Sequence, residues 1–574
     1  MLNIDLSADG KFDTEISELF SKICYNNREN FNELIMKCSD ENKKNINWWV
    51  SNPASRNTLN SNLYLDFCKV QLVIHLLSVG ELINEIIVDS KDMHKVLKQV
   101  SGLDKIKITL KRKKIISTLK EILAILVLPL RDIIIRIYHL LLFKTIFIHK
   151  FQIPDHPITL IDTYALPGYY SKDRYYNGLW QSLNNEEKKD IYFVPTIVMT
   201  KWNKIYSAYK DLLKSERQFL FKESFLKFSD ILFAVAHPLR VHCIKINGLV
   251  LNGIDYLPLV KEDLRHRTGY GLAIGGLINY RFVKRLKEKK ININRVIDWW
   301  ESQALDKGLH KGLNDYYPEV PVIGYLGYAP RNLELQLFPT IFEQENSIVP
   351  EEIAVIGKGF VNGMKIFNPN QKVTHAPAFR FQHLWNRESH SPDKETYTIL
   401  IALPITFDDS VHIIKQMIAC IDKISMQSLR FWVKPHPTMP ENKLKREFVS
   451  IWPKSFEFIA IDTQTALRKA DIVVSGMSSI CLEAMALGVP VLVIDQSRGL
   501  QYNPIPGDLR QDLWKQCSSN QDILDGIDLY RNRNDKELNR HKELGQQIRE
   551  TYFKHVTREG VLKFLGIEGD SPFA

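Results

Sequence analysis

The chain has 574 residues, 45% of them hydrophobic, and a formal net charge of +10 at pH 7. A single hydrophobic core would be unusual at this length, so the composition favours two folded domains. The excess of basic residues is compatible with nucleic acid, but no helix-turn-helix, zinc or RNA-binding motif accompanies it, which argues against a nucleic-acid partner.

Cysteine usage and the N-terminus both point to the cytoplasm. The seven cysteines include no Cys-x-x-Cys pair, so reduced thiols are favoured over a zinc site. The first residues, MLNIDLSADGKFDTE, lack a basic stretch followed by an apolar one, so no secretory signal is visible. We therefore expect the protein to stay inside the cell.

The first part of the chain has the pattern of a parallel α/β domain. Ile46–Ser51 and Ile83–Ser90 are predicted strands with a predicted helix, Leu63–Leu77, between them, which is the order of a Rossmann-like βαβ unit. Further strands are predicted at Ile158–Tyr164, Ile191–Met199, Val320–Tyr328 and Ile353–Gly359, and helices at Trp202–Lys227 and Tyr270–Lys289. We expect one Rossmann-like domain over residues 1–386.

A basic and then apolar segment, residues 105–151, is predicted to be an insertion in this domain. Lys105–Lys114 reads KIKITLKRKK, and Ile115–Phe151 is apolar but broken by charges and by Pro129. No part of it reaches the roughly 18 to 20 uninterrupted apolar residues of a membrane-spanning helix. The pattern favours a pair of helices in the interface of an anionic membrane, with a buried helical hairpin as the alternative.

The second half of the chain begins after a polar stretch, Arg387–Glu395, which we interpret as the break between domains. The strand YTILIALPI follows it, and Phe431–Pro437 then reads FWVKPHP, an apolar run that delivers a Lys and a His to the end of a strand. A second run, Asp471–Ile494, contains a small-residue turn that opens a helix. We expect residues 395–540 to form the second Rossmann-like domain and residues 541–574 a helical end segment.

These two runs predict a phosphate-binding site. Ser478 and Ser479 stand where a helix begins, so their hydroxyls and the free backbone N–H groups of its first turn suit an anion. Lys434 adds a positive charge, and His436, held between two prolines, can donate an N–H to a phosphate oxygen. Glu483, about one turn further along, can accept hydrogen bonds from ribose hydroxyls. Each piece alone is ordinary, since a His-Pro pair is usually a turn and a Ser-Ser pair usually a helix cap.

The order of these motifs resembles the nucleotide half of GT-B glycosyltransferases. The His-Pro and Ser motifs resemble those of bacterial CMP-sugar transferases, notably sialyltransferases and capsular Kdo transferases. The resemblance implies an α/β GT-B fold of two facing Rossmann-like domains, with a terminal helix that crosses back to the first domain. The runs WWVSNPASRN, IDTYALPGYYSKDRYY and VPVIGYLGYAP resemble a group of bacterial surface-carbohydrate biosynthesis proteins, which implies a role in capsule or lipopolysaccharide synthesis.

Sugar transfer needs a base that takes the proton from the acceptor hydroxyl. Glu301 is the first candidate, because the two preceding tryptophans can desolvate its carboxylate and raise its pKa. Asp306 and His310, four residues apart on one helical face, form a second candidate pair. A salt bridge between Glu301 and a nearby basic residue is an equally simple interpretation.

Two further features carry similar residue types. One is a loop that suits an acidic or glycan acceptor, although a surface turn explains it equally well: Tyr169, Tyr170, Arg174, Tyr175 and Tyr176. The other is His237-Pro238, which repeats the His-Pro pair after the run ILFAVA and is predicted to cap a strand at the cleft.

Together these features predict a glycosyltransferase that moves an acidic sugar, Kdo or another nonulosonic acid, from a CMP-activated donor to a surface glycan. The enzyme is expected at the inner face of the cytoplasmic membrane, bound there through residues 105–151. No cofactor and no metal are expected, because no Asp-x-Asp follows a strand. The alternatives are a CDP-polyol phosphotransferase, a UDP-sugar glycosyltransferase and a non-catalytic membrane-bound scaffold of polysaccharide assembly.

Overall fold

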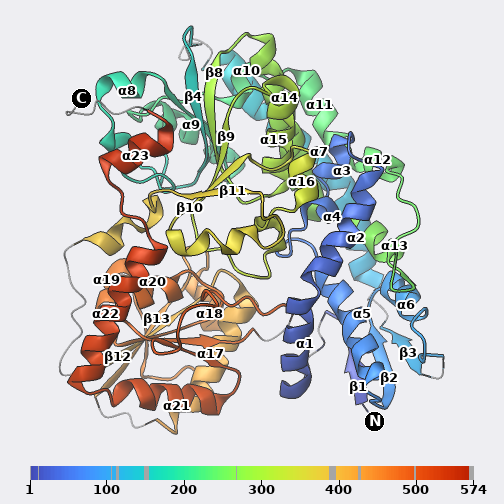
Figure 1. Ribbon diagram of the computed structural model, residues 1–574, viewed down its shortest axis with the longest axis vertical. Coiled ribbons are helices and arrows are strands. Elements are labelled where there is room, and N and C mark those ends of the chain that lie inside the picture. Colours follow the sequence, from blue (N-terminus) through green and yellow to red (C-terminus); the bar gives the residue numbers. More distant parts are fainter. Residues whose placement is uncertain are drawn as a thin grey trace.

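The computed structural model of the chain contains three parallel β-sheets surrounded by helices (Figure 1). It describes residues 2–8, 10, 12–104, 106–111, 115–147, 154–266, 268–386, 396–424, 428–496 and 499–567, and within the helix Ile115–Thr145 it describes the side chains from Leu130 onward. Two of the sheets have six strands and the third has three. The predicted break Arg387–Glu395 lies outside the described residues.

The first six-stranded sheet has the strand order β11-β10-β9-β8-β4-β5, and all its neighbouring strands are parallel. Its strands are β4 (Ile158–Ala165), β5 (Ile191–Ile197), β8 (Ile293–Trp299), β9 (Val322–Leu326), β10 (Glu352–Val355) and β11 (Lys372–His375). Because both faces of such a sheet are covered by helices, its strands are apolar runs rather than alternating patterns. The four strands predicted in this part of the chain are confirmed.

Helices α14 (Thr268–Glu288) and α15 (Ala304–Tyr316) pack closely beside this sheet. A side chain at Gly308 would place its Cβ 2.0 Å from the Gly276 carbonyl oxygen, so glycine is required where the two helices touch. The predicted helix Tyr270–Lys289 is confirmed by α14.

The helical stretch predicted over Trp202–Lys227 is confirmed only in part, because it is not continuous. The structure has a short 3-10 turn, η3 (Trp202–Lys204), followed by α9 (Ile205–Leu213) and α10 (Lys222–Phe225). The chain between the two helices lies beside β5, where the Phe193 N–H donates to the Gln218 carbonyl oxygen at 2.8 Å. These sheet-type hydrogen bonds replace the helical ones.

The second six-stranded sheet has the order β14-β13-β12-β15-β16-β17 and is also entirely parallel. Its strands are β12 (Tyr397–Ala402), β13 (Leu429–Lys434), β14 (Phe456–Phe458), β15 (Ile472–Ser475), β16 (Val491–Ile494) and β17 (Trp514–Cys517). The helices between them are α17 (Phe407–Ile421), α18 (Glu441–Glu447), α19 (Thr463–Lys469) and α20 (Ile480–Ala486), and α21 (Asn520–Arg531) follows β17. This alternation is the doubly wound arrangement expected of a Rossmann-like domain.

The third sheet, with the order β1-β2-β3, is separate from both. It consists of β1 (Leu2–Asp5), β2 (Ile83–Val88) and β3 (Lys107–Leu110), and its helices are α1 (Thr14–Asn26), α2 (Arg28–Asp40), α5 (Leu63–Ser78) and α6 (Lys91–Leu97). The predicted helix Leu63–Leu77 and the predicted strand at Ile83 are therefore confirmed, but they belong to this small sheet.

The strand predicted at Ile46–Ser51 is wrong, because this segment forms the short helix α3 (Ile46–Trp49), followed by α4 (Asn52–Ser55). The two adjacent tryptophans are both buried. The Trp48 indole N–H donates to Ser39 Oγ at 2.9 Å, and the Trp49 indole N–H donates to the Lys43 carbonyl oxygen at 2.8 Å. Two adjacent bulky apolar residues favour a strand prediction. Here a helical turn buries both tryptophans and provides an acceptor for each indole N–H.

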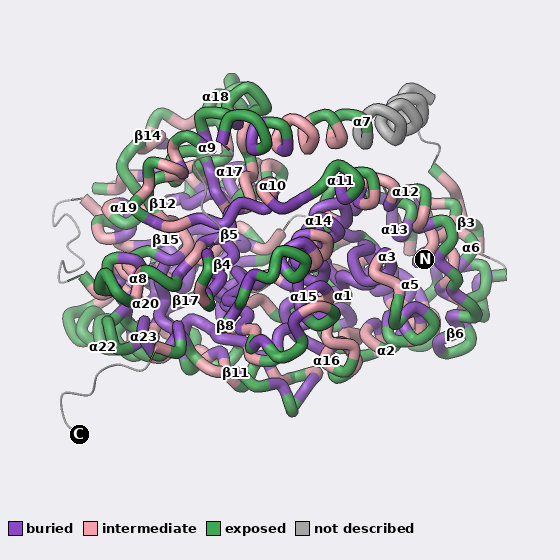
Figure 2. Tube along the Cα trace, turned by 90° about the horizontal axis from the view of Figure 1, so that it is seen from above, coloured by how far each residue is buried: buried purple, intermediate pink, exposed green. Residues whose placement is uncertain are grey.

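The apolar segment forms one helix, α7 (Ile115–Thr145), which continues across Pro129, so the predicted pair of helices is wrong. In the order of the chain, α7 connects β3 of the small sheet to β4 of the first six-stranded sheet, so it is not an insertion within a single sheet. Figure 2 shows α7 along one edge of the molecule, with α9, α10 and α11 (Phe228–Val235) beside it. Among the described residues, no helix is long and apolar enough to cross a membrane.

The end of the chain returns to the N-terminal half. Helix α22 (Asp535–Tyr552) packs against α20, and α23 (Arg558–Leu565) lies on the first six-stranded sheet (Figure 1). The Phe564 ring is 5.3 Å from the Tyr325 ring of β9. Two facing Rossmann-like domains with a terminal helix that crosses back make up the GT-B fold, as the sequence predicted.

Candidate functional site

The predicted phosphate-binding residues meet at the carboxyl edge of the second six-stranded sheet, where ligands bind in open α/β sheets. Lys434 is the last residue of β13, and its Nζ donates to the Ile461 carbonyl oxygen at 2.5 Å. Burial lowers the pKa of Lys434, and the nearby Asp462 carboxylate opposes that shift. The side chain is half-buried at this edge.

His436 is held in one orientation by the turn that follows it. Its Nδ1 accepts a hydrogen bond from the Thr438 backbone N–H at 3.3 Å and lies 2.7 Å from Thr438 Oγ1. Burial lowers the pKa of His436, and Arg174 and Arg380 lower it further. A neutral imidazole whose Nδ1 is an acceptor carries its proton on Nε2, so Nε2–H is the group left to donate to a ligand.

The small-residue turn opens a helix, as predicted, because α20 begins at Ile480 directly after Ser478 and Ser479. Ser479 Oγ donates to Glu483 Oε1 at 3.1 Å, and the Ile480 N–H donates to Ser478 Oγ at 3.4 Å. The second oxygen of Glu483, Oε2, lies 3.2 Å from His383 Nε2, which comes from the other domain. Glu483 therefore stands at the contact between the two domains.

Glu301 lies at the carboxyl edge of the first six-stranded sheet, two residues after the end of β8. Its Oε1 accepts the Trp299 indole N–H at 2.9 Å, and its Oε2 accepts the Gln303 amide at 2.5 Å. Burial raises the pKa of Glu301, while those two donors and Arg380 act in the opposite direction. The predicted direction of the shift is confirmed, whereas the catalytic role of Glu301 stays a prediction.

Asp306 and His310 do not pair with each other. Asp306 Oδ2 accepts the backbone N–H groups of Glu301 and Gln303 at 3.0 and 2.9 Å, so this carboxylate fixes the turn that carries the candidate base. His310 Nε2 lies 2.9 Å from Asp298 Oδ2 in a buried pair, and burial lowers the pKa of His310 to about 3. The geometry gives Asp306 a positioning role; a catalytic role stays a prediction.

Arg380, which the sequence analysis did not single out, links the two edges. It lies in the 3-10 segment η8 (Phe379–Trp385), and its guanidinium carbon is 5.9 Å from the Trp299 ring and 6.0 Å from the Tyr175 ring. It lowers the pKa of both Glu301 and His436. It therefore stands between the candidate base and the nucleotide edge.

Arg174 reaches the same place from the aromatic loop. In the described part of the chain, neither Arg174 nor Arg380 has an ion pair or a hydrogen bond; their contacts are with aromatic rings. The loop is anchored by Asp173, which pairs with Arg217 at 2.8 Å, and by the Tyr175 ring, 4.5 Å from the Trp299 ring. The only sequence signal for Arg380 was a basic residue inside the aromatic run AFRFQHLW.

His237 is not part of this site. The run ILFAVA is helical and lies in α11, and His237 begins the short helix α12 (His237–Arg240), so the predicted strand cap is wrong. The His237 side chain is buried, with Nδ1 3.1 Å from Asn47 Oδ1, and burial lowers its pKa to about 3.

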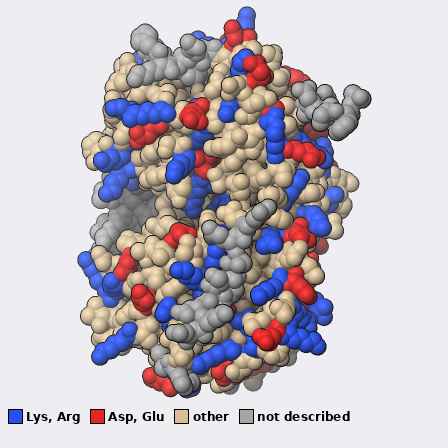
Figure 3. Space-filling model, turned by 90° about the vertical axis from the view of Figure 1, so that its left-hand side faces the viewer, with Lys and Arg blue, Asp and Glu red and all other residues tan. Residues whose placement is uncertain are grey.

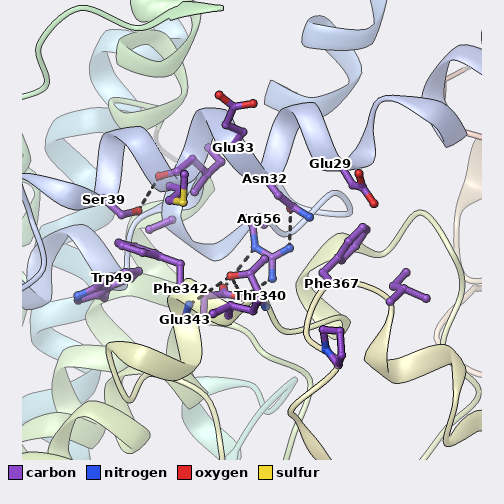
Figure 4. Close-up of a pocket in the computed structure, with 16 residues that line it drawn as sticks. Glu29, Asn32, Glu33, Ser39, Trp49, Arg56, Thr340, Phe342, Glu343 and Phe367 are labelled. Carbon is purple, nitrogen blue, oxygen red and sulfur yellow. Dashed lines mark hydrogen bonds and ion pairs between the residues drawn. The ribbon is translucent and has the colours of Figure 1, made fainter.

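A separate pocket of about 310 Å³ lies between α2, α3 and α16 (Ile341–Glu345) (Figure 4). Its lining is mostly apolar and includes Ile35, Met36, Trp49, Phe342 and Phe367. On one side Glu343 pairs with Arg56 at 2.5 Å, and on the other it pairs with Lys307 at 2.6 Å. Arg56 and Lys307 share the Glu343 carboxylate, so this buried group joins the segment after α4 to α15 and α16.

Charge on the face formed by the two Rossmann-like domains is distributed rather than concentrated. Figure 3 shows Lys and Arg side chains over both domains, with Asp and Glu among them. Within the described ranges, no group of three or more His, Cys, Asp or Glu side chains is arranged to hold a metal ion. The expected independence from metal stays a prediction.

No protein-family model matches the chain, and no curated protein matches it. Among solved structures, it is similar to the N-terminal domain of Candida albicans trehalose-6-phosphate phosphatase, at 9% identity and TM-score 0.42, over 72% of this chain and 98% of that one. S. aureus MnaA with UDP has 11% identity and TM-score 0.41, over 73% and 99%. The lipopolysaccharide outer core galactosyltransferase WaaB has 10% identity and TM-score 0.39, over 71% and 99%. At such low identities and TM-scores, the sheet topology and the returning helix remain the basis for the fold.

Proposed function

We propose that the protein is a GT-B glycosyltransferase whose active site lies between Glu301 and His436. The observation that carries this proposal is the position of the segment η8 between the two edges. The guanidinium carbon of Arg380 lies 5.9 Å from the Trp299 ring, whose N–H donates to Glu301, and His383 Nε2 lies 3.2 Å from Glu483 Oε2 on α20. A carboxylate with a raised pKa suits a general base for an acceptor hydroxyl. A neutral imidazole that presents Nε2–H, beside a helix start, suits the leaving phosphate of a nucleotide.

The donor we propose is a CMP-activated acidic sugar, of the Kdo or nonulosonate class. Arg174 and Arg380 bring two guanidinium groups to the middle of the site without an ion pair inside the described part of the chain. Buried or half-buried arginines normally pair with an anion, and a planar guanidinium matches a carboxylate in a bidentate manner. A donor with a carboxylate on its sugar supplies that anion in addition to the nucleotide phosphate, whereas a UDP-linked neutral sugar supplies only its diphosphate.

In this proposal the nucleotide contacts come from Lys434, His436, Ser478, Ser479 and Glu483. The acceptor is a glycan or glycolipid at the inner face of the cytoplasmic membrane, and residues 105–151 attach the enzyme there. The described part of α7 supports attachment, because its Leu130 and Ile134 side chains are exposed apolar groups.

The experiment that tests the donor is calorimetric titration of the purified protein with CMP, CDP and UDP, followed by a CMP-linked nonulosonic acid. We expect CMP to bind best among the nucleotides, and the CMP-linked sugar to bind more tightly than CMP. Arg380→Gln should weaken binding of the sugar nucleotide by about tenfold to a hundredfold, which is the range for a hydrogen bond to a charged group. It should leave the affinity for CMP unchanged.

Arg446→Gln, a loss of the same charge on the exposed face of α18, is the matched control. A preference for UDP or CDP would replace the CMP donor with one of the alternatives. Equal loss of CMP and CMP-sugar affinity in Arg380→Gln would contradict carboxylate recognition. No nucleotide binding at all would favour a scaffold.

A further inference from the structure

Large apolar side chains are exposed on three segments that lie together in the fold. The α7 segment contributes Leu130, Ile134, Leu141 and Ile146; the turn before α9 and its start contribute Met199, Trp202 and Tyr206; and α11 contributes Phe228 and Leu232. Trp202 is 69% exposed and Met199 is 65% exposed. Helix α11 packs against α7, and the Tyr206 ring stacks on Phe147 at 5.7 Å. Figure 2 shows α7, α9 and α11 along the same edge of the molecule.

The exposed residues of α7 form one helical face. Leu130, Ile134 and Leu141 are four and seven residues apart, which places them on the same side of the helix. The opposite side is buried and includes Leu140 and Phe143. The helix thus packs one apolar face into the protein and turns a second apolar face outward. Exposed contiguous apolar surface of this kind marks an interaction site.

Basic side chains accompany this apolar surface. Lys201, Lys204 and Lys210 are exposed next to Trp202 and Tyr206, and Lys144 is exposed near the end of α7. Within the described residues, none of these four ammonium groups has an ion pair. Lysines, a tryptophan and aliphatic side chains on one surface are the composition of a helix or turn that lies in the interface of an anionic bilayer.

We propose that this surface, formed by residues 130–146, 199–210 and 228–232 and called here the α7 edge, binds an anionic lipid bilayer. Trp202 and Met199 enter the interface, and the lysines contact lipid phosphates. The proposal deepens the membrane attachment given above by adding two segments that are remote in sequence from the basic apolar one. It does not depend on the donor, because lipid binding is measured without any nucleotide.

The test is co-sedimentation of the full-length protein with vesicles of phosphatidylglycerol and phosphatidylcholine, compared with phosphatidylcholine alone. We expect binding to the anionic vesicles that weakens with salt. Lys201→Glu with Lys204→Glu should weaken it at least about tenfold, because each surface cation contributes about a fivefold factor and reversal also adds repulsion. Met199→Ala with Trp202→Ala should also weaken it. Lys536→Glu with Lys542→Glu on α22 and Leu82→Ala, all exposed positions outside this surface, should not.

Insertion of Trp202 has its own readout. Brominated lipids should quench part of the protein fluorescence, and Trp202→Phe should remove that part while the folded structure is retained. Binding that is unchanged in both double variants, or quenching that persists in Trp202→Phe, would overturn the proposal. So would a stable dimer in sedimentation velocity that the same variants dissociate, because the surface would then bind a second copy of the chain. Retained nucleotide binding in the variants would show that they lose lipid binding without damage to the proposed active site.

Discussion

At the carboxyl edge of the N-terminal sheet, Asp298, Asp306 and His310 are buried and hydrogen-bonded within the protein. At the corresponding edge of the C-terminal sheet, Lys434 and His436 are half-buried. Lys434 Nζ donates to the Ile461 carbonyl oxygen of its own domain, and the Thr438 N–H donates to His436 Nδ1. Both sheets are six-stranded and parallel, although their strand orders differ. The first edge is filled by the protein's own buried charges, whereas the second carries half-buried basic side chains. In the proposed function, the first edge tunes the protonation state of Glu301 and the second binds the nucleotide phosphate.

The largest expected effect is on the tuned edge. Glu301→Gln keeps the shape of the side chain and removes its basicity, so turnover should fall by about 10²- to 10⁴-fold, the usual contribution of a general base. Binding of CMP should not change, because the proposed nucleotide contacts lie on the other sheet. Steady-state kinetics and calorimetry on the same preparation measure both. Normal turnover in this variant would end the assignment of Glu301.

The buried ion pairs of Glu343 should contribute strongly to the free energy of unfolding. Glu343→Gln leaves Arg56 and Lys307 buried without their shared anion, which should cost about 3–5 kcal/mol of the free energy of unfolding. Urea denaturation measures this cost. Glu345→Gln, an exposed position on the same helix, is the control and should change stability little. A loss equal to that of the control would mean that the charges contribute nothing.

The same group gives a pH dependence. Burial acts to raise the pKa of Glu343, but Arg56 and Lys307 outweigh it and lower the pKa to about 2 from an ordinary value of 4.5. A carboxylate whose pKa is depressed in the folded state stabilises it above the unfolded pKa. This stability should be fully present above about pH 4.5 and lost as the pH falls toward 2. Glu343→Gln should lack that acid transition.

Substitutions at the edge of the C-terminal sheet should change the affinity for CMP. His436→Ala removes the Nε2–H donor, so affinity for CMP should fall by about tenfold to a hundredfold, as for a lost hydrogen bond to a charged phosphate. Ser479→Ala should weaken binding less, since its hydroxyl already bonds to Glu483. Calorimetric titration compares the two. A larger effect from Ser479→Ala would place the phosphate nearer α20 than His436.

The smallest expected effect is a shift in pH dependence. The acid limb of turnover should lie above the ordinary Glu pKa of 4.5, because Glu301 must be deprotonated and burial raises its pKa. Gln303→Met removes a donor that lowers this pKa, so the limb should move further toward higher pH. A pH–rate profile of both proteins measures the shift, and movement toward lower pH would contradict the role of Gln303.

The sequence predicted the sheets better than the contacts between them. Short runs rich in apolar and β-branched residues, such as Ile158–Tyr164, were correctly assigned as strands, although the same pattern failed at Ile46–Ser51. The raised pKa of Glu301 was also predicted, from the two tryptophans that precede it, whereas the strand β8 before it was not. Arg380 was not, since its importance arises only when η8 is placed between two domains that are remote in sequence.

The errors share a physical cause. Ile46–Ser51 has the composition of a strand, but both of its tryptophans find hydrogen-bond acceptors in a helical turn. Pro129 has no backbone N–H to donate, yet α7 continues through it. In both places interactions outside the local sequence outweigh local preference.

The return of α22 and α23 has a mechanical consequence. The end of α22 already reaches the N-terminal half, where the Tyr552 ring lies 4.9 Å from the Phe360 ring, and α23 follows it onto the first six-stranded sheet. The C-terminal Rossmann-like domain is therefore fastened to the other domain by its returning helices as well as by the chain that enters it. Arg380 and His383 share the segment η8, so any rotation of one domain relative to the other would move both side chains together relative to the edge of the second sheet.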